Sequence, residues 1–558
     1  MTIPEAKAGA EIQFPAWNAL YQIRDFVKNV QGLEARCDER AFLLVRLDLY
    51  TWSSGEQSCA ALEVRYRVYL AEDSVFASVL DRHHAYLNPA TVLFYLPRER
   101  ARPVRVRFLP PAGWKLATFL AGPSPDGVYS AANFDELADS PVEAGTFEEH
   151  QYQQNGALYR IIVDAGRNRY DSGRVIESVK KITAAATALM QDVPFSRYTF
   201  LYHFGRDTGG GMEHRDGTAI HFAADDLRRN WLGFESVTAH EFIHAWNVKR
   251  LRPHNLEPVD YVRGNDTSDL WFAEGVASTL QEYILLRAGM MSPDTFYARV
   301  AAEINRLHDR PARATQSLED AGREAWLEKY PDYQRPDRSI SYYGKGMIVG
   351  ILLDLAIRHS SRNARSLDDV FRRLNRDFAK RGRFFTREDL VGVISEEAGP
   401  EFDVHGFFRD YISGMRELDY ATYFARAGLR LAGREREAGT LGFLAVRNFD
   451  GPVVVQSVVP ESNAAKAGLE SGDVLLELNG NPLRSLPDDL LRDSKPGREV
   501  RFLVRRDHQE FTVRFQLESG VRAAYHIVEV RDATPEQGRL RELWLKGVTT
   551  SAAAAGKR

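Results

Sequence analysis

Cysteine is scarce in this chain of 558 residues, and neither sign of charge dominates it. The two cysteines, Cys37 and Cys59, are too few for a disulfide framework and lack the paired spacing of a thiolate zinc site, so they form one bridge or none. Lys and Arg number 73 against 77 acidic residues, which leaves a formal net charge of −4. The balance excludes a strongly basic chain, and we expect no nucleic-acid partner.

Long hydrophobic runs and targeting segments are also missing. The longest apolar run, from Met347 to Ile357, is too short to cross a membrane and contains Asp354. Residues 1–11 lack a basic region followed by an apolar core, so no signal peptide is visible. We therefore expect no membrane span and, by default, a cytoplasmic protein.

The length leaves room for three or four domains, of which the first is rich in β-structure. Apolar and polar residues alternate from Leu62 to Leu70 and again from Val104 to Phe108, with prolines and glycines between such runs. This pattern predicts a β-sandwich-like domain over residues 1–165.

The period becomes helical after residue 165. Residues 175–189 carry an apolar stripe at helical spacing, and Ser366 and Thr386 begin capping boxes. The many arginines between 358 and 383 alternate with acids, which favours a solvated helix face over a polyanion site. We predict a mainly helical domain over residues 166–430, so that the fold is multidomain α+β.

The most informative motif in this helical region is the pattern H-E-x-x-H. On a helix, His240 and His244 stack one turn apart, which lets two imidazoles bind one zinc ion. Glu241 then lies beside the open position of the metal, where it can act as a general base on water attacking a carbonyl. We expect this helix to stop near Leu251, because Pro253 disfavours helical geometry in the residue before it.

A tetrahedral catalytic zinc needs a third protein ligand and keeps its fourth position for water. Glu274 is the best candidate, because it lies in an otherwise apolar run that we expect to form a second helix. An unpaired carboxylate is costly to bury, and a metal ion would compensate for that cost.

A glycine-rich segment, residues 209–214, precedes the zinc motif. Its glycines would let a substrate backbone approach closely, and Glu213 is an acid able to bind a free α-amine, as an exopeptidase requires. Alternatively, the segment is a turn between strands at 199–204 and 219–222, with Glu213 merely exposed.

Two adjacent tyrosines, Tyr342 and Tyr343, are candidates for donating a hydrogen bond to the oxyanion of a tetrahedral intermediate. The alternative for either is an aromatic ring packed at the start of a helix. The residue types alone do not choose between them.

The order and spacing of these motifs resemble the gluzincin aminopeptidases, a clan with thermolysin-like catalytic domains. Residues 269–277 match its pattern Asp-Leu-Trp-x-x-Glu-Gly-x-Ala, and residues 343–346 match Tyr-x-Lys-Gly, which selects Tyr343. Residues 209–214 stand where the clan carries Gly-x-Met-Glu-Asn, with His214 in place of the asparagine.

Within this clan the chain resembles peptidase family sixty-one, the glycyl aminopeptidases. Members join Gly-Gly-Met-Glu-His to H-E-x-x-H-x-W-N-x-K-R, as residues 210–214 and 240–250 do here, and add a PDZ module. Residues 15–26 resemble an early segment of the family's N-terminal domain; relatives have strands before it, so the true N-terminus and export stay open. The resemblance implies one Zn²⁺ per chain on His240, His244 and Glu274, catalysis by Glu241 and Tyr343, and substrate binding by Gly210, Gly211, Met212 and Glu213.

Residues 441–446 and 467–480 resemble a PDZ domain, which we predict over residues 431–520. The Leu-Gly-Phe loop that begins at Leu441 can present backbone N–H groups to the C-terminal carboxylate of a peptide. Alternatively, the module is only a packed lid. Residues 521–558 are predicted to be an extension that ends in a loose tail.

Three functions remain open. The first is a zinc aminopeptidase acting on peptides with small N-terminal residues, Gly or Ala, a preference that the resemblance implies. The second is a zinc endopeptidase whose PDZ domain captures protein C-termini, and the third is a non-enzymatic PDZ scaffold that binds peptides. The intact zinc motif argues against the third, and Glu213 favours the first over the second.

Overall fold

The computed structural model describes residues 1–551 except 19–20, 22, 206–208, 329–337, 448–451 and 484. The chain divides into two compact units: the first contains residues 1–184, 192–250 and 255–266, and the second contains 185–191, 251–254 and the chain from 267 onward. Residues 552–558 of the predicted tail lie outside the described residues. Over the described part of the chain, every helix is too short or too polar to cross a membrane.

The first unit begins with small antiparallel sheets. One has the order β1-β7-β3-β4 and a second the order β2-β6-β5. Their strands are β1 (Thr2–Ala6), β2 (Glu11–Gln13), β3 (Val30–Cys37), β4 (Arg40–Phe42), β5 (Val45–Arg46), β6 (Thr51–Ser53) and β7 (Cys59–Val68). The predicted alternation is confirmed in β7, where Leu62 and Val64 are buried. Cys37 and Cys59 form one disulfide between β3 and β7.

Two further groups of strands follow in the same unit. Val104 to Val106 form β10, which pairs with β12 (Tyr129–Ala131). A four-stranded antiparallel sheet has the order β11-β13-β9-β8. It consists of β8 (Val79–Leu80), β9 (His84–Leu87), β11 (Lys115–Thr118) and β13 (Val142–Gly145). A short helix, α1 (Phe134–Ala138), precedes β13, and the side chain of Asn133 caps its N-terminus.

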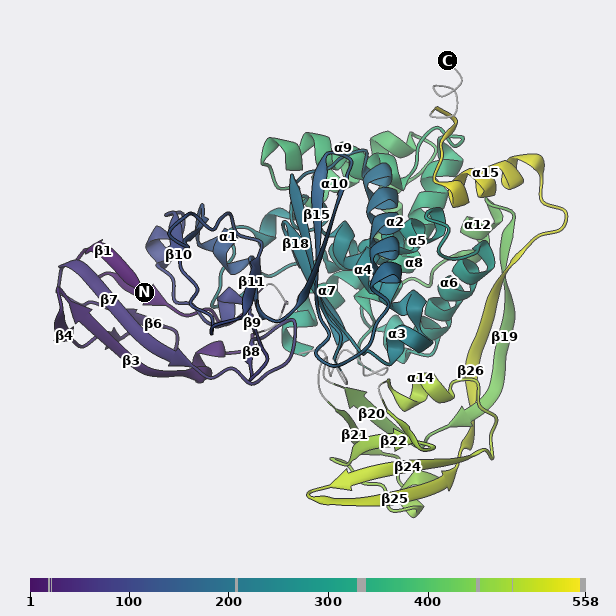
Figure 1. The fold of residues 1–558 in the computed structure, drawn as a ribbon. Coiled ribbons are helices and arrows are strands. Elements are labelled where there is room, and N and C mark those ends of the chain that lie inside the picture. Colours follow the sequence, from purple (N-terminus) through teal and green to yellow (C-terminus); the bar gives the residue numbers. More distant parts are fainter. Residues whose placement is uncertain are drawn as a thin grey trace. The chain divides into compact units, whose positions relative to one another are not determined.

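The largest sheet of the first unit contains β15 and β18, which are labelled in Figure 1, and has the order β14-β15-β16-β18-β17. Its strands are β14 (Glu148–Gln154), β15 (Ala157–Asp164), β16 (Arg197–His203), β17 (Gly209–His214) and β18 (Gly217–Phe222). β15, β16 and β18 are parallel, whereas β14 and β17 are antiparallel edge strands. Asn155 and Gly156, both with positive φ, form the tight hairpin turn between β14 and β15.

Helix α2 (Ser172–Met190) links β15 to β16, and helices α3 (Asp226–Arg229) and α4 (Trp231–Ile243) follow β18. The predicted stripe of α2 is confirmed, because Val175, Val179 and Ile182 are fully buried. α4 lies against β17 and β18. This packing positions the zinc motif over the glycine-rich strand.

The second unit is mainly helical. A π-helical segment (Trp271–Val276) leads into α5 (Ala277–Arg287), followed by α6 (Pro293–His308), α7 (Leu318–Glu328), α8 (Tyr342–Ser360), α9 (Leu367–Asp377), α10 (Arg387–Ala398), α11 (Val404–Tyr411) and α12 (Tyr420–Ala425). The capping boxes predicted at Ser366 and Thr386 are confirmed. Asp354, the acid in the apolar run, is fully buried in α8 and pairs with Arg358 one turn later at 3.2 Å.

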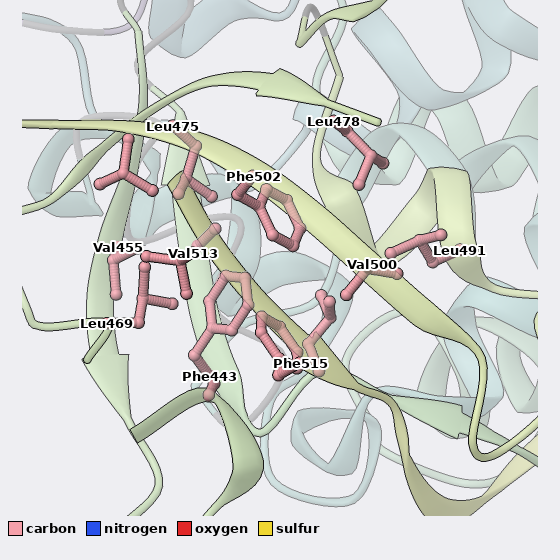
Figure 2. Packing of buried hydrophobic residues seen from close by; sticks show 14 of the residues in the cluster. Phe443, Val455, Leu469, Leu475, Leu478, Leu491, Val500, Phe502, Val513 and Phe515 are labelled. Carbon is pink, nitrogen blue, oxygen red and sulfur yellow. The ribbon is translucent and has the colours of Figure 1, made fainter. Parts of the chain in front are cut away.

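The PDZ region folds around its own core in the second unit. Its sheet has the order β20-β21-β22-β24-β25, with β23 paired to β22. The elements are β20 (Phe443–Arg447), β21 (Val453–Val458), α13 (Asn463–Lys466), β22 (Val474–Leu478), β23 (Asn481–Pro482), α14 (Pro487–Leu491), β24 (Glu499–Arg506) and β25 (Gln509–Gln516). Phe443, Phe502 and Phe515 point toward one another in this core (Figure 2).

A long two-stranded ribbon flanks the PDZ core. β19 (Leu429–Thr440) enters it, and β26 (Glu518–Glu529) leaves it and pairs with β19 along its whole length. After β26 the chain ends in α15 (Pro535–Lys546), which packs on α5 and α8. The predicted extension after residue 520 is therefore structured up to this helix.

Candidate functional site

The two motif histidines lie at the C-terminal end of α4, whose first turn is capped by the side chain of Asn230. His240 is half-buried, His244 is buried, and their ring centroids are 4.7 Å apart. The predicted helix end near Leu251 is wrong, because α4 ends at Ile243 and a series of turns follows. His244 keeps helical dihedral angles as the C-cap residue, so both histidines still face the same side.

The tautomer of His244 follows from its hydrogen bond. Its Nδ1 lies 2.5 Å from the carbonyl oxygen of Asn247, which can only accept, so Nδ1 carries the proton. The lone pair then resides on Nε2, the atom available to a metal. Histidine ligands are commonly oriented by such a backbone acceptor, so this residue fits a metal site.

The side chain of Glu241 packs directly against Gly211 of β17. A Cβ atom at residue 211 would overlap the Glu241 carboxylate. A side chain at residue 211 would therefore displace the Glu241 carboxylate from its position against β17. The carboxylate of the H-E-x-x-H motif consequently lies on the backbone of the glycine-rich strand.

The glycine-rich segment is an edge strand of the large sheet, with β18 on one side only. Side chains alternate along a strand, so Glu213 projects to the same face as the Cβ position of Gly211, the face on which Glu241 lies. Met212 points to the other side and is buried, with its sulfur 3.6 Å from the Asn88 amide nitrogen. The alternative of a simple turn is wrong, since residues 209–214 are extended and paired.

Asp139, directly after α1, connects the end of β17 to the turns after α4. Its carboxylate lies 3.1 Å from Nδ1 of His214 and 2.7 Å from Nζ of Lys249, and it also accepts from the backbone N–H of Arg215. Burial of Asp139 opposes its ionisation, but Lys249 and His214 hold the pKa of this carboxyl far below its ordinary value. Sequence reasoning missed this residue, because a single acid after a short helix carries no motif.

Glu274 belongs to the second unit, where it is buried in the π-helical segment that begins the predicted second helix and continues into α5. This segment packs tightly on α8: a Cβ atom on Gly275 would lie 2.6 Å from Cα of Gly346 and 2.5 Å from the carbonyl oxygen of Tyr342. The glycine contact allows the two backbones to touch. It fixes the segment that carries Glu274 against the first turns of α8.

The two candidate tyrosines begin α8 and differ in exposure. Tyr342 is fully buried, Tyr343 is half-buried, and their rings stack with centroids 4.8 Å apart. Ser341 caps the helix by accepting from the N–H of Gly344 at 2.9 Å. Burial lowers the pKa of Lys345 to about 8, against a smaller opposing effect of Glu417. Of the two phenols, that of Tyr343 is the more accessible to a ligand.

Three segments of the chain match known protein families. Residues 1–146 match the peptidase M61 N-terminal domain, residues 233–349 the M61 glycyl aminopeptidase model, and residues 454–506 a PDZ domain. The fold is similar to that of an aminopeptidase N family protein from Idiomarina loihiensis, with a TM-score of 0.79 and 23% identity over 98% of this chain and 96% of that one.

A second solved structure, Legionella pneumophila aminopeptidase A in complex with aspartic acid, gives a TM-score of 0.44 and 11% identity over 96% of this chain and 57% of that one. A search of curated proteins gave no significant match. The matches to the family models define the class of the protein, which is a peptidase with a separate PDZ module. The chain contains an M61 glycyl aminopeptidase domain, the M61 N-terminal domain and a PDZ domain, as the resemblance of its motifs predicted.

We expect Asp139→Asn to destabilise the protein by about 1.5–3 kcal/mol, the value of a hydrogen bond to a charged group. The pKa of Asp139 is lowered in the folded protein, so its contribution is fully present above the unfolded-state pKa of about 4 and is lost as the pH falls below it. Denaturant unfolding of the wild type and the variant, measured at several pH values from 7 to 3, determines this contribution.

The difference in unfolding free energy between the wild type and Asp139→Asn should therefore shrink on acidification. Asp266→Asn is the control, because Asp266 is an exposed loop residue of the same unit, and its unfolding midpoint should equal that of the wild type. A difference between Asp139→Asn and the wild type that is independent of pH would contradict the assigned role of the charge.

Proposed function

We propose that this protein is a zinc-dependent aminopeptidase that removes small N-terminal residues, glycine or alanine, from peptides. The observation that carries the proposal is the packing of Glu241 on Gly211, because the same face of the edge strand presents Glu213. Glu241, the proposed general base, and Glu213, an acid able to bind an α-amine, thus lie on the same face of β17. An edge strand can also pair with an extended substrate through its open side.

We propose His240, His244 and Glu274 as the ligands of one Zn²⁺, in a catalytic domain with a thermolysin-like arrangement. Two imidazole nitrogens and one carboxylate oxygen form a donor set that can hold this ion. The tautomer of His244 and the burial of Glu274 support these assignments. When bound, Zn²⁺ supplies Lewis acidity that polarises the scissile carbonyl and makes water acidic.

The remaining steps belong to the chain's own residues. Glu241 takes a proton from the attacking water and passes it to the leaving amine. The phenol of Tyr343 donates a hydrogen bond to the oxyanion as the tetrahedral intermediate forms. Glu213 binds the substrate's free α-amine, and the backbone of Gly210, Gly211 and Met212 lies along the substrate.

The PDZ domain suggests a peptide ligand, and the second candidate function, an endopeptidase that captures protein C-termini, depends on it. β20 is an edge strand that begins at Phe443, the last residue of the Leu-Gly-Phe segment. However, the Glu518 carboxylate accepts from the N–H of Asn463 at 2.9 Å and lies beside Gly442 of this loop. The chain's own Glu518 carboxylate therefore lies next to the loop that would bind the C-terminal carboxylate of a peptide. This contact favours the aminopeptidase over the endopeptidase as the first proposal.

Hydrolysis of glycyl- and alanyl-p-nitroanilide, compared with that of the N-acetylated compounds, tests the function. We expect cleavage of the free-amine substrates only, its loss with a chelator and its return with added Zn²⁺. Glu213→Ala and Glu213→Gln should both weaken this cleavage, because the amine loses its anionic partner. Cleavage of the blocked substrates by the wild type would instead favour the endopeptidase.

Glu241→Gln should retain bound zinc but lose turnover by roughly 10²- to 10⁴-fold, because it lacks the general base. Metal analysis and kcat measured on the same sample separate the two effects. The matched control is Glu235→Gln on the same helix, where Glu235 is buried and accepts from Ser178 at 2.7 Å. Near-normal turnover of the Glu241 variant would refute the mechanism.

Tyr343→Phe should lower kcat by roughly 10²- to 10³-fold with little change in KM, as expected when one oxyanion donor is removed. Its neighbour provides the control, since Tyr342→Phe removes a buried hydroxyl of the same helix turn and should leave kcat within a few-fold of the wild type. Steady-state kinetics of both variants measure the contrast. If the Tyr342 variant shows the larger loss of kcat, Tyr342 rather than Tyr343 is the oxyanion donor.

A further inference from the structure

Three histidines outside the zinc motif gather within the first unit. Asp164 of β15, His203 of β16 and His221 of β18 are register partners across three parallel strands. Side chains in one such row project to the same face of the sheet. The ring centroids of His203 and His221 are 4.2 Å apart, and the ring of His84 from β9 lies 5.4 Å from that of His203.

The nitrogen and oxygen atoms of this group are spaced as metal ligands require. Potential ligand atoms of Asp73, His203 and His221 lie within 4.8 Å of one another, and so do those of His84, Asp164 and His203. Nδ1 of His221 is 3.4 Å from the Asp73 carboxylate, and Nδ1 of His84 is 3.7 Å from that of Asp164. Ligands on a tetrahedral zinc with bonds of about 2.0–2.1 Å are separated by about 3.4 Å, so each pair is spaced closely enough to bind an ion, and the two groups share His203.

A buried glutamate from the neighbouring sheet supports this reading. Glu143 of β13 is 1% exposed, and one of its carboxylate oxygens lies 2.6 Å from Nε2 of His203. Among the described residues its other oxygen, Oε1, has no hydrogen-bond partner. A carboxylate that holds one nitrogen of a histidine directs the other nitrogen to a metal, and such partners are usual around bound zinc.

The backbone also makes room for the cluster. A Cβ atom on Gly145 would lie 3.0 Å from Cβ of His84, its register partner in the β13–β9 pair. That distance is too short for a side chain without movement of the neighbouring strand. Glycine at residue 145 therefore lets His84 lie close to β13, whose Glu143 contacts His203.

We propose that these residues form a second metal site, which binds one Zn²⁺ or a similar divalent transition-metal ion. His203 and His221 are its central ligands, Asp73 supplies oxygen, and His84 supplies the further imidazole, with Asp164 beside it. Imidazole with carboxylate is a donor set that suits zinc, copper or nickel rather than calcium or magnesium. The site is separate from the one on α4 and does not depend on the proposed catalytic activity.

Such an ion would connect two sheets. Its histidine ligands come from β16 and β18 of the large sheet and from β9 of the β11-β13-β9-β8 sheet. His221 is also the register partner of Gly210 on the glycine-rich edge strand. The ion would therefore stabilise the first unit close to the strand proposed to bind substrate, and its binding should raise the unfolding temperature by mass action.

The test uses the full chain with His240→Gln and His244→Gln, which removes the proposed catalytic site and leaves the cluster intact. After chelator treatment and dialysis, Zn²⁺ is titrated by calorimetry, and bound zinc is measured after gel filtration. We expect about one bound Zn²⁺ per chain and a higher unfolding temperature with the ion. Adding His203→Gln and His221→Gln to this variant should abolish the zinc binding and the rise in unfolding temperature. Circular dichroism checks that the chain is still folded.

Two further variants keep the test decisive if the core substitutions unfold the chain. Asp73→Asn alters a half-exposed carboxylate and should weaken zinc binding at least tenfold. His83→Gln, at the exposed neighbour of His84, should not change it. The proposal would be overturned if the variant with His240→Gln and His244→Gln bound no zinc. It would also be overturned if neither Asp73→Asn nor the cluster substitutions changed the binding.

Discussion

The contact between the Glu241 side chain and the backbone of Gly211 is the constraint on which the proposed chemistry depends. The Glu241 carboxylate lies where a side chain at residue 211 would otherwise be. Strand periodicity then places Glu213 on the face of β17 that Glu241 covers. Asp139 connects the ends of both elements, because it binds His214 at the end of the strand and Lys249 in the turns after the helix.

The second unit uses the same device in another place. The contact of Gly275 with Gly346 brings the π-helical segment onto α8, which sets the buried Glu274 in a fixed relation to the start of that helix. A π-helical turn shifts the following residues relative to an α-helix and is often found where a side chain has a functional position. In both units, therefore, close backbone packing determines where the proposed catalytic side chains lie.

Much of this arrangement was predictable from residue patterns. H-E-x-x-H, the strand periodicity of β7, the capping boxes and the PDZ loop each depend on local spacing, and the family match confirms the chain's class. The end of α4 was mispredicted because Pro253 constrains only its neighbour, whereas the turns after Ile243 depend on tertiary bonds such as that from Arg250 to the Asp216 carboxylate. The role of Asp139, the Cys37–Cys59 bridge and the His203 cluster could not be predicted, since each joins residues distant in sequence.

The glycine contacts also bear on how this protein can change over evolutionary time. Gly211, Gly275 and Gly346 take no part in the proposed chemistry, yet each lies where an added methyl group would collide with a neighbour. A mutational scan scored by activity would rank them beside His240 or Glu241. Diversification of substrate preference is therefore expected to proceed through the residues around these glycines, while the three positions themselves stay fixed.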